Sequence, residues 1–366
     1  MTRSAARRID AARILLILAT VCVTTVGLVG SASANGGTAY VQPGQSIQAA
    51  IDRAHPGDRI IVLAGTYAEQ LTVDKNGIHL VGRGAVLIPP SSPVLNTCSG
   101  LAGEGTEAGI CITGKDVVLD PFDIVQMEHR KFVSVGTRVK DASIDGFQVR
   151  GFSGENIAVV GARNTRVTGN SLAEGTRYGF LTVGSENTRA GFNTVTSAAT
   201  LRFIGICMDD LGGAVVTSNH ISGYQVALCV QTARAEVRNN DVSASCFGVF
   251  VDPGIVGAKI HRNHIGGTNP NCGPGKGTAV GILLFGAVNT DVRGNHIEGQ
   301  TVPGGAAGVA VVDVSASGPF ASGNVVTHNV LHNNDLDLFV SSVGIGNVLK
   351  RNECATSDPH GLCTPN

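Results

Sequence analysis

The chain has 366 residues, of which 49 are glycine, none is tryptophan and only 15% are charged. This composition indicates a structure rich in turns and poor in helix. The formal charge of −1 also means that the chain has no excess of basic residues, which nucleic-acid-binding proteins typically have. A domain built around a single hydrophobic core is usually shorter than this chain. One domain of this size should therefore be a barrel, a large sheet or an array of repeats.

Residues 1–34 are predicted to be a secretory signal peptide. A basic start precedes an apolar run from 14 to 29 and the small-residue exit Ala32-Ser33-Ala34. The alternative is a membrane anchor, but the run is slightly short to span a bilayer. Cleavage would remove four Arg and one Asp from 27 basic and 28 acidic residues, leaving 23 and 27 and a formal charge of −4. We therefore expect a secreted protein whose mature chain, residues 35–366, is one domain without a membrane segment.

The start of the mature chain predicts a short helix followed by strands. Ser46 is suited to cap the N-terminus of a helix that carries Ile47, Ala50 and Ile51 on one face. Pro56-Gly57 would end this segment, and the strands would begin after it. Such a helix could close the open end of a solenoid.

The same segment resembles the N-terminal cap of right-handed parallel β-helix proteins of the pectin-lyase-like superfamily. The resemblance extends from about residue 40 to 354 and implies an all-β fold: a single-stranded right-handed parallel β-helix, or solenoid, with a short N-terminal capping helix. It leaves the function open, because this architecture serves lyases, hydrolases, epimerases, adhesins and non-catalytic proteins. The matching residues are Val41 to Asp52, Pro56-Gly57-Asp58, Ile60-Ile61-Val62 and Gly65-Thr66-Tyr67.

One phrase, apolar-x-x-Asn-x-apolar, recurs along the chain. Its asparagines are spaced by 23, 26, 21, 23, 32, 34 and 23 residues, which predicts one coil per repeat with the excess residues looping out. Inward asparagines at the same turn of each coil can hydrogen-bond to one another, and so form an asparagine ladder. The asparagines are Asn170, Asn193, Asn219, Asn240, Asn263, Asn295, Asn329 and Asn352.

An alternating strand follows most of these asparagines by about eight residues, as in Gly205-Ile206-Cys207-Met208-Asp209. The second and fourth positions are almost uniformly apolar and should point inward, so the third and fifth should point outward. Eight of the nine cysteines lie in the predicted mature chain, and an even number in an exported chain predicts disulfides, while the absence of Cys-x-x-Cys argues against a zinc ribbon or redox motif. Register or proximity suggests the pairs Cys207–Cys229, Cys246–Cys272, Cys98–Cys111 and Cys354–Cys363.

In the pectin-lyase-like superfamily the outer face of this sheet usually carries the groove and the chemistry. Here its fifth positions on three successive coils are Asp209, Gln231 and Asp252. The two carboxylates would lie about 9 to 10 Å apart, near the upper end of the separation in inverting glycosidases. We predict Asp209 and Asp252 as catalytic acid and base in unassigned order, with Asp210 beside them. Asp209-Asp210 is similar to the paired aspartates of polygalacturonases, but the Gly-His-Gly and Arg-Ile-Lys elements of that family are missing. The structural alternative is that these aspartates only cap turns.

Further residues could bind substrate around the carboxylates. Two arginines precede the strands and could neutralise a uronate carboxylate, but no Lys or Arg occupies the outward stripe itself, which favours hydrolysis over elimination. No cofactor is expected, except that calcium could bridge Asp209, Asp210 and Asp252. The enlarged loops 266–278 and 299–306 would either wall a groove or simply cover the apolar residues beneath them. The predicted substrate-binding residues are Gln231, Asp313, Phe250, Phe285, Arg177 and Arg202.

The leading hypothesis is a monomeric protein that binds or modifies an extracellular polysaccharide or cell-wall glycan. A second is a non-catalytic binding or structural solenoid, which is favoured by the lack of Trp and by only four Tyr, since sugar grooves usually use aromatic platforms. A third is a metal-binding, periplasmic-type β-helix protein. It depends on His220, Asp241, His264 and His296, which would lie outward on four consecutive coils, although solvent-facing polar residues are ordinary at such positions.

Overall fold

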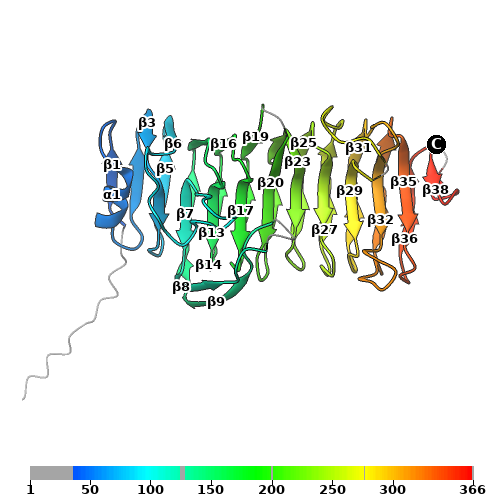
Figure 1. Cartoon of the computed structure of the whole chain (residues 1–366), viewed down its shortest axis with the longest axis horizontal. Coiled ribbons are helices and arrows are strands. Elements are labelled where there is room, and N and C mark those ends of the chain that lie inside the picture. Colours follow the sequence, from blue (N-terminus) through cyan, green and yellow to red (C-terminus); the bar gives the residue numbers. More distant parts are fainter. Residues whose placement is uncertain (1–35, 124–127, 199–200, 276, 365–366) are drawn as a thin grey trace, which may run out of the picture. The chain divides into compact units, whose positions relative to one another are not determined.

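The structure, a computed structural model, describes residues 36–123, 128–198, 201–275 and 277–364. These residues form an elongated solenoid of stacked parallel strands (Figure 1). The predicted signal peptide lies outside the described residues. None of the helices in the described part of the chain has the length and apolar content needed to cross a membrane.

Three long sheets, here called sheets 1, 2 and 3, make up the solenoid, and neighbouring strands within each are parallel. Sheet 1 has, in spatial order, β1 (Thr38–Val41), β2 (Arg59–Val62), β5 (His79–Gly82), β11 (Ser143–Asp145), β15 (Arg166–Thr168), β18 (Arg189–Gly191), β21 (Val215–Thr217), β24 (Glu236–Arg238), β27 (Lys259–His261), β30 (Asp291–Arg293), β33 (Val325–Thr327) and β36 (Val348–Lys350). Sheet 2 has β3 (Gly65–Ala68), β6 (Ala85–Ile88), β12 (Gln148–Arg150), β16 (Ser171–Ala173), β19 (Thr194–Thr196), β22 (His220–Ser222), β25 (Asp241–Ser243), β28 (His264–Ile265), β31 (His296–Glu298), β34 (Val330–His332), β37 (Asn352–Glu353) and β39 (Cys363–Thr364). Sheet 3 has β4 (Leu71–Val73), β7 (Ile110–Thr113), β13 (Glu155–Val160), β17 (Tyr178–Val183), β20 (Arg202–Asp209), β23 (Tyr224–Val230), β26 (Phe247–Val251), β29 (Val280–Phe285), β32 (Ala307–Val312), β35 (Leu336–Ser341) and β38 (Ser357–Asp358).

The asparagine ladder is confirmed. Asn193 Nδ2 donates to Asn219 Oδ1 at 3.0 Å, and Asn219 Nδ2 donates to Asn240 Oδ1 at 2.9 Å. The same bond continues through Asn263, Asn295 and Asn329 to Asn352. Every ladder amide is buried, and its bonds satisfy polar groups at a turn that would otherwise be costly to exclude from water.

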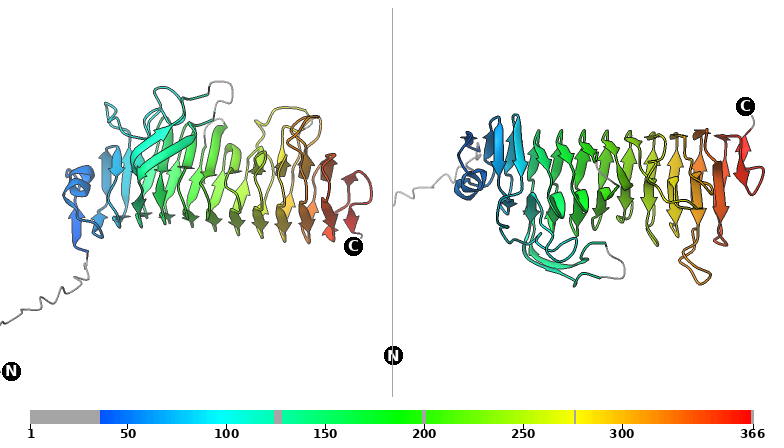
Figure 2. Two further views of the ribbon diagram at one scale, coloured as in Figure 1. Left: turned by 90° about the horizontal axis from the view of Figure 1, so that it is seen from below. Right: turned by 45° about the horizontal axis from the view of Figure 1, so that its top comes forward.

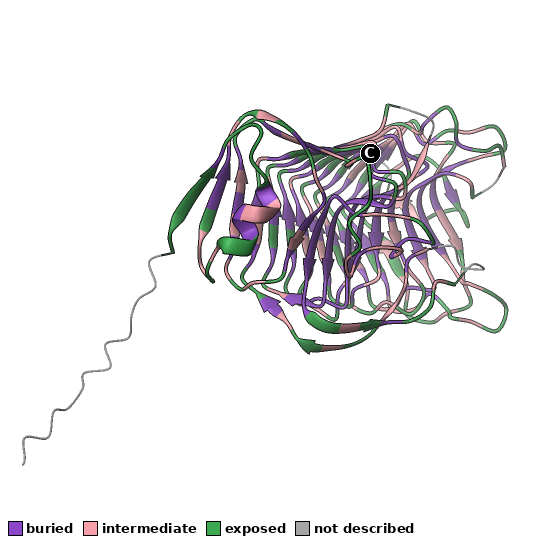
Figure 3. Cartoon of the chain, turned by 60° about the vertical axis from the view of Figure 1, so that its left-hand side comes forward, coloured by how far each residue is buried: buried purple, intermediate pink, exposed green. Residues whose placement is uncertain are grey.

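The alternation within the strands of sheet 3 is also confirmed. Ile206 and Met208 point into the apolar core, whereas Cys207 belongs to a separate cluster on the outer face. Buried residues line the interior of the coils along the whole solenoid (Figure 3). The predicted disulfides are present: Cys98–Cys111, Cys207–Cys229, Cys246–Cys272 and Cys354–Cys363.

Helix α1 (Ile47–Arg53) is the predicted cap. The Ser46 hydroxyl accepts a hydrogen bond from the Ala49 amide at 3.1 Å, and Ile47, Ala50 and Ile51 are buried. The helix packs against β1, β2 and β4, so it covers the first coil. It therefore keeps water from the N-terminal end of the core.

One long excursion, described at residues 114–123 and 128–138, departs from the coil pattern after β7. It contains the antiparallel hairpin β8 (Lys115–Leu119) and β9 (Phe132–Thr137) and leads into β10 (Val139–Lys140), which pairs with β14 (Ala162–Arg163). The hairpin stands out on one side of the solenoid (Figure 2). The excursion packs on the outer face of sheet 3, where Leu119 and Phe132 join the cluster around Val160, Leu181 and Cys207.

Candidate functional site

Three polar residues form a stripe where strands of sheet 3 end. Asp209 is the last residue of β20, and Gln231 and Asp252 directly follow β23 and β26. Met208 pairs with Val230, and Val230 pairs with Val251, so the residues after them lie one above another. With strands about 4.8 Å apart, the backbone positions of Asp209 and Asp252 are separated by about 9.6 Å. The predicted stacking is confirmed.

The excursion adds Glu128, His129 and Lys131 to this stripe. His129 Nε2 lies 2.9 Å from Asp209 Oδ2, and His129 Nδ1 lies 3.2 Å from the Tyr178 hydroxyl. An ionised carboxylate can only accept, so Nε2 carries the proton and Nδ1 accepts from Tyr178. Because His129 and Tyr178 are both buried, this chain of bonds anchors the excursion to the sheet.

Gln231 and Lys131 together connect Asp252 with Asp209. Its Oε1 accepts a hydrogen bond from Lys131 Nζ at 2.6 Å, and its Nε2 donates to Asp252 Oδ2 at 2.6 Å and to Glu128 Oε2 at 2.9 Å. Lys131 Nζ also lies 3.0 Å from Glu128 Oε2 and 3.4 Å from Asp209 Oδ2. Since the ammonium can only donate, it fixes which end of the Gln231 amide faces which neighbour.

The two aspartates of the stripe are driven to opposite protonation states. Burial raises the pKa of Asp252 to about 7, and the negative charge of Glu128 adds to the effect. Burial would also raise the pKa of Asp209, but the hydrogen bond from His129 and the charge of Lys131 outweigh it and hold that pKa below the usual value. Burial lowers the pKa of His129 against the pull of Asp209, so the imidazole is neutral near pH 7. Near neutral pH the site therefore offers one ionised carboxylate and one that readily holds a proton.

The site is open to solvent in part. The side chains of Lys131, Glu128 and Asp209 are 38%, 28% and 21% exposed. A cavity of about 290 Å³ lies beside Glu128, His129 and Lys131 and is also lined by Asp120 and Pro121. A ligand can thus reach the stripe from the side of the excursion.

Asp210 does not belong to the outward stripe. It is buried, its amide donates to the Thr232 hydroxyl at 2.8 Å, and Thr182 and Thr188 face its carboxyl inside the coil. Burial raises the pKa of Asp210 to about 6. Asp210 follows the outward Asp209, so the same alternation turns it into the coil, and the structure does not bring together the three carboxylates predicted to bridge calcium.

The two predicted arginines lie far from the carboxylates. Arg202 begins the eight-residue strand that Asp209 ends, which separates the two backbones by about 23 Å. Its Nε lies 3.7 Å from Glu174 Oε2. Arg177 precedes the neighbouring strand, and its guanidinium lies over the Phe203 ring at 4.5 Å. Both arginines therefore lie at the N-terminal ends of the strands of sheet 3, whereas the stripe lies at their C-terminal ends. The cation that contacts the stripe is Lys131.

Asp313 organises a loop. Its carboxylate accepts hydrogen bonds from the amides of Ala321 and Val343, both at 2.8 Å, and from the Ser342 hydroxyl. These bonds hold its pKa below the usual value although burial opposes them. This is the turn-capping role that was the structural alternative for aspartates at strand ends.

Phe250 and Phe285 lie on the outer face of sheet 3, next to the stripe. Their ring centroids are 6.0 Å apart in an edge-to-face contact, and Phe250 is two residues from Asp252. Further along the face, a cavity of about 380 Å³ is lined by Phe285, Leu283 and Phe339, with Gly277 and Ala306 contributed by the enlarged loops. The loops thus wall an apolar groove that begins at Phe285, on the coil next to the one that carries Asp252.

Glu128, His129 and Lys131 were missed by the sequence analysis. They belong to no repeat, so their position over the stripe could not be derived from the 23-residue period. A signal was present, however, because four consecutive ionisable residues at 128–131 stand out in a chain with only 15% charged residues. They also lie in an interruption longer than one coil.

Comparison with known proteins agrees with the geometry of the coils. Residues 204–363 match the family described as "Right handed beta helix region". Among solved structures, the A-module of a mannuronan C-5 epimerase from Azotobacter vinelandii is 18% identical with a TM-score of 0.53, covering 85% of this chain and 92% of its own. The polygalacturonase from Erwinia carotovora ssp. carotovora is 12% identical with a TM-score of 0.52, covering 88% and 94%. The Dettilon tailspike protein is 17% identical with a TM-score of 0.51, covering 84% and 62%.

A search of curated proteins gives no match. The structural likenesses establish the fold and not the activity, since all three identities are low. The described residues therefore have the right-handed parallel β-helix fold, and residues 204–363 carry the sequence pattern of the matching family model.

Proposed function

We propose that the protein is a secreted polysaccharide hydrolase in which Asp252 is the general acid and Asp209 is the general base. The observation that carries this proposal is the stacking of two carboxylates on either side of Gln231 in surroundings that shift their pKa values in opposite directions. A pair of acids whose pKa values are pushed apart is the usual arrangement for acid–base hydrolysis of a glycosidic bond.

In this reaction Asp252 would give its proton to the leaving glycosidic oxygen. Asp209 would take a proton from the attacking water, and it contacts His129 and Lys131 through Oδ2, so Oδ1 is the oxygen available for this role. The separation of about 9.6 Å leaves room for a water molecule, so we expect inversion of the anomeric centre.

The surroundings support a glycan as ligand. The apolar groove that begins at Phe285 offers aromatic faces on which sugar rings can pack. Structures with the same fold include proteins named for polymeric uronates, a mannuronan epimerase and a polygalacturonase. Secretion is supported by the four disulfides, which persist in oxidising compartments.

A second candidate is proton abstraction from a uronate, by elimination or epimerisation. Lys131 favours it, because its ammonium at the stripe could neutralise a substrate carboxylate. Glu128 and Asp209, the two carboxylates that contact Lys131, oppose it, because an anionic substrate would meet their negative charges at the same place.

The test is incubation of the purified protein with polygalacturonate, mannuronan and neutral glycans, with and without calcium. New reducing ends, inverted anomers by NMR, and loss of both in Asp252→Asn and Asp209→Asn are expected. Asp291→Asn on sheet 1 serves as the control. Ultraviolet absorbance of an unsaturated uronate, or deuterium uptake from solvent into the polymer, would instead establish the second candidate. If all substrates bind without any product, the protein is a non-catalytic binding module.

A further inference from the structure

A column of histidines and carboxylates runs along the outer face of sheet 2, on a different side of the coil from the stripe. His220 pairs with Asp241, Asp241 with His264, and His264 with His296, so the predicted stacking on four consecutive coils is confirmed. Asp241 is engaged on both sides: its two oxygens lie 2.9 Å from His220 Nδ1 and 2.8 Å from His264 Nδ1. This upper part of the column is thus internally paired.

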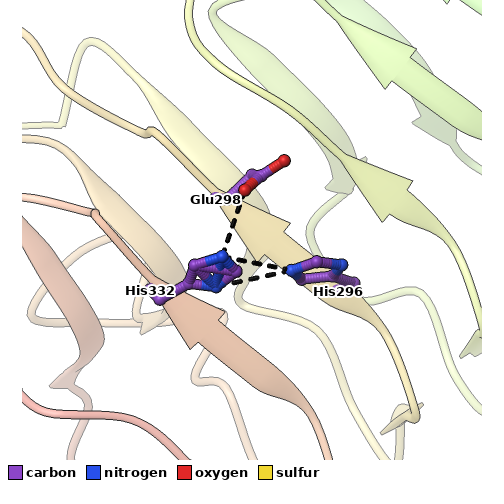
Figure 4. Close-up of side chains that lie close together, drawn as sticks. All are labelled: His296, Glu298 and His332. Carbon is purple, nitrogen blue, oxygen red and sulfur yellow. Dashed lines mark hydrogen bonds and ion pairs between the residues drawn. The ribbon is translucent and has the colours of Figure 1, made fainter.

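The lower part has a different composition. Glu298 lies two residues after His296 on β31, and it pairs directly with His332 on β34. His332 Nε2 lies 3.1 Å from Glu298 Oε2, and His296 Nε2 lies 3.4 Å from both ring nitrogens of His332 (Figure 4). One ligand atom from each of the three residues falls within 4.8 Å of the other two.

We propose that His296, Glu298 and His332 form a binding site for a divalent transition-metal ion, with Zn²⁺ as its representative. Two imidazoles and one carboxylate are the donor set of three-ligand zinc sites, in which water fills the fourth position. For bond lengths of about 2.0 to 2.1 Å and tetrahedral angles, neighbouring ligand atoms are about 3.3 Å apart. With His332 Nε2 as the ligand atom, two of the three separations, 3.1 Å to Glu298 and 3.4 Å to His296, match this edge, and the third is within 4.8 Å.

Neighbouring residues hold the ligands in place. His264 Nε2 lies 3.2 Å from Glu298 Oε1, which leaves Oε2 directed at His332. Asp241 in turn fixes the ring of His264. A carboxylate–histidine–carboxylate chain of this kind orients a ligating group and is common behind metal ligands.

The rings of His296 and His332 are stacked, with centroids 4.7 Å apart and an interplanar angle of 27°. Lone pairs lie in the ring planes, so binding requires the His332 ring to turn toward the shared position. His332 is 41% exposed and Glu298 is 37% exposed, so solvent surrounds much of both and little packing opposes this rotation. The same exposure gives an ion direct access.

The donor atoms also predict which ions bind. Imidazole nitrogen suits Zn²⁺, Cu²⁺ and Ni²⁺, whereas Ca²⁺ and Mg²⁺ prefer sites made of oxygen. The proposed site shares no residue with the Asp209–Asp252 stripe. Its existence is therefore independent of the proposed hydrolase activity.

The test is isothermal titration calorimetry of the purified protein with Zn²⁺ in a non-chelating buffer, together with visible spectra after Co²⁺ addition. We expect one ion per chain, the intense d–d bands of a tetrahedral Co²⁺ centre, and no binding of Mg²⁺ at the same concentration. His332→Ala and Glu298→Gln should each lower the Zn²⁺ affinity by more than the roughly 10- to 100-fold loss seen when outer partners of a metal site are removed. Asp241→Asn, which alters only such an outer partner, should fall within that range.

The matched control is His261→Ala, which breaks a 2.9 Å contact between His261 and Asp291 on sheet 1 and should leave Zn²⁺ binding unchanged. Circular dichroism checks that each variant is folded. The proposal is overturned if His332→Ala binds Zn²⁺ as the parent does, or if Co²⁺ gives only the weak spectrum of the hydrated ion. Either result would show that the histidines merely form a hydrogen-bonded polar surface.

Discussion

Replacing Glu128 with glutamine should lower the pKa of Asp252. Glu128 Oε2 and Asp252 Oδ2 both accept hydrogen bonds from Gln231 Nε2, at 2.9 and 2.6 Å. A glutamine at position 128 keeps an acceptor for this bond and removes only the charge. The substitution therefore isolates the repulsion that helps Asp252 keep its proton.

The size of the effect follows from these two bonds. The oxygens cannot be more than about 5.5 Å apart, and at about 5 Å two unit charges interact by roughly 0.8 kcal/mol in water and about 3 kcal/mol at an effective dielectric constant of 20. Glu128 is 28% exposed, which places the site toward the weaker end of this range. Since 1.36 kcal/mol equals one pKa unit, we expect a decrease of about one unit.

The assay is a ¹³C NMR titration of the protein labelled at the aspartate carboxyl carbons. The resonance missing from Asp252→Asn identifies Asp252, and its midpoint should move from about 7 in the parent to about 6 in Glu128→Gln. Glu236→Gln, on sheet 1, is the control and should leave the midpoint unchanged. A parent midpoint near 4, or an unmoved midpoint in Glu128→Gln, would refute the electrostatic account of the site.

Three further predictions concern stability and the anchoring of the excursion. Because the folded-state pKa of Asp252 lies above the ordinary value of 3.8, the folded protein binds this proton more tightly than the unfolded chain. The parent should thus lose free energy of unfolding relative to Asp252→Asn as the pH rises from about 4 to about 7, and parallel urea-unfolding curves across that window would contradict this. Asn240→Ala removes four ladder hydrogen bonds and leaves buried groups of its neighbours without partners, so we expect a loss of about 3 to 5 kcal/mol in urea unfolding, against about 0.5 kcal/mol or less for Ser222→Ala. A loss equal to that of the control would mean that the ladder contributes no stability. Gly184→Ala should displace the excursion, because φ is +59° and the new methyl group would overlap the Phe132 ring. His129 should then react with diethyl pyrocarbonate, whereas Gly44→Ala, at φ +85° with open space around it, should leave His129 protected.

The sequence was sufficient to predict the coils, for a physical reason. A parallel stack has one register per coil, and an inward asparagine such as Asn219 marks that register in a phrase of six residues. Once the asparagines are aligned, the direction of every strand residue follows from simple alternation. This is why the stacking of Asp209 on Gln231 and the bond between Cys207 and Cys229 could be predicted.

The rest of the site depends on contacts that no local pattern encodes. Asp210 was placed in the site because it adjoins Asp209 in the sequence, but the alternation that turns Asp209 outward turns Asp210 into the coil, and the residue is buried. Arg202 was assigned to the site because it comes shortly before Asp209 in the sequence. The eight-residue strand β20 separates them, so Arg202 lies at the other end of that strand from Asp209. Lys131 reaches Gln231 across 100 residues of sequence, through a loop whose path is set by packing on already folded coils.

The long reach of the excursion has a consequence for the order of folding. Ladder bonds join residues 21 to 34 positions apart along the chain, so each coil can form on the one before it. The bonds of Glu128, His129 and Lys131 to Asp209 and Gln231 instead span 78 to 103 positions, and closing such loops is entropically costly until both ends are ordered. The contacts of the excursion with the stripe should therefore form only after the coil that carries Gln231 has folded. In a nascent chain that ends before this coil, the excursion would have no surface to pack against.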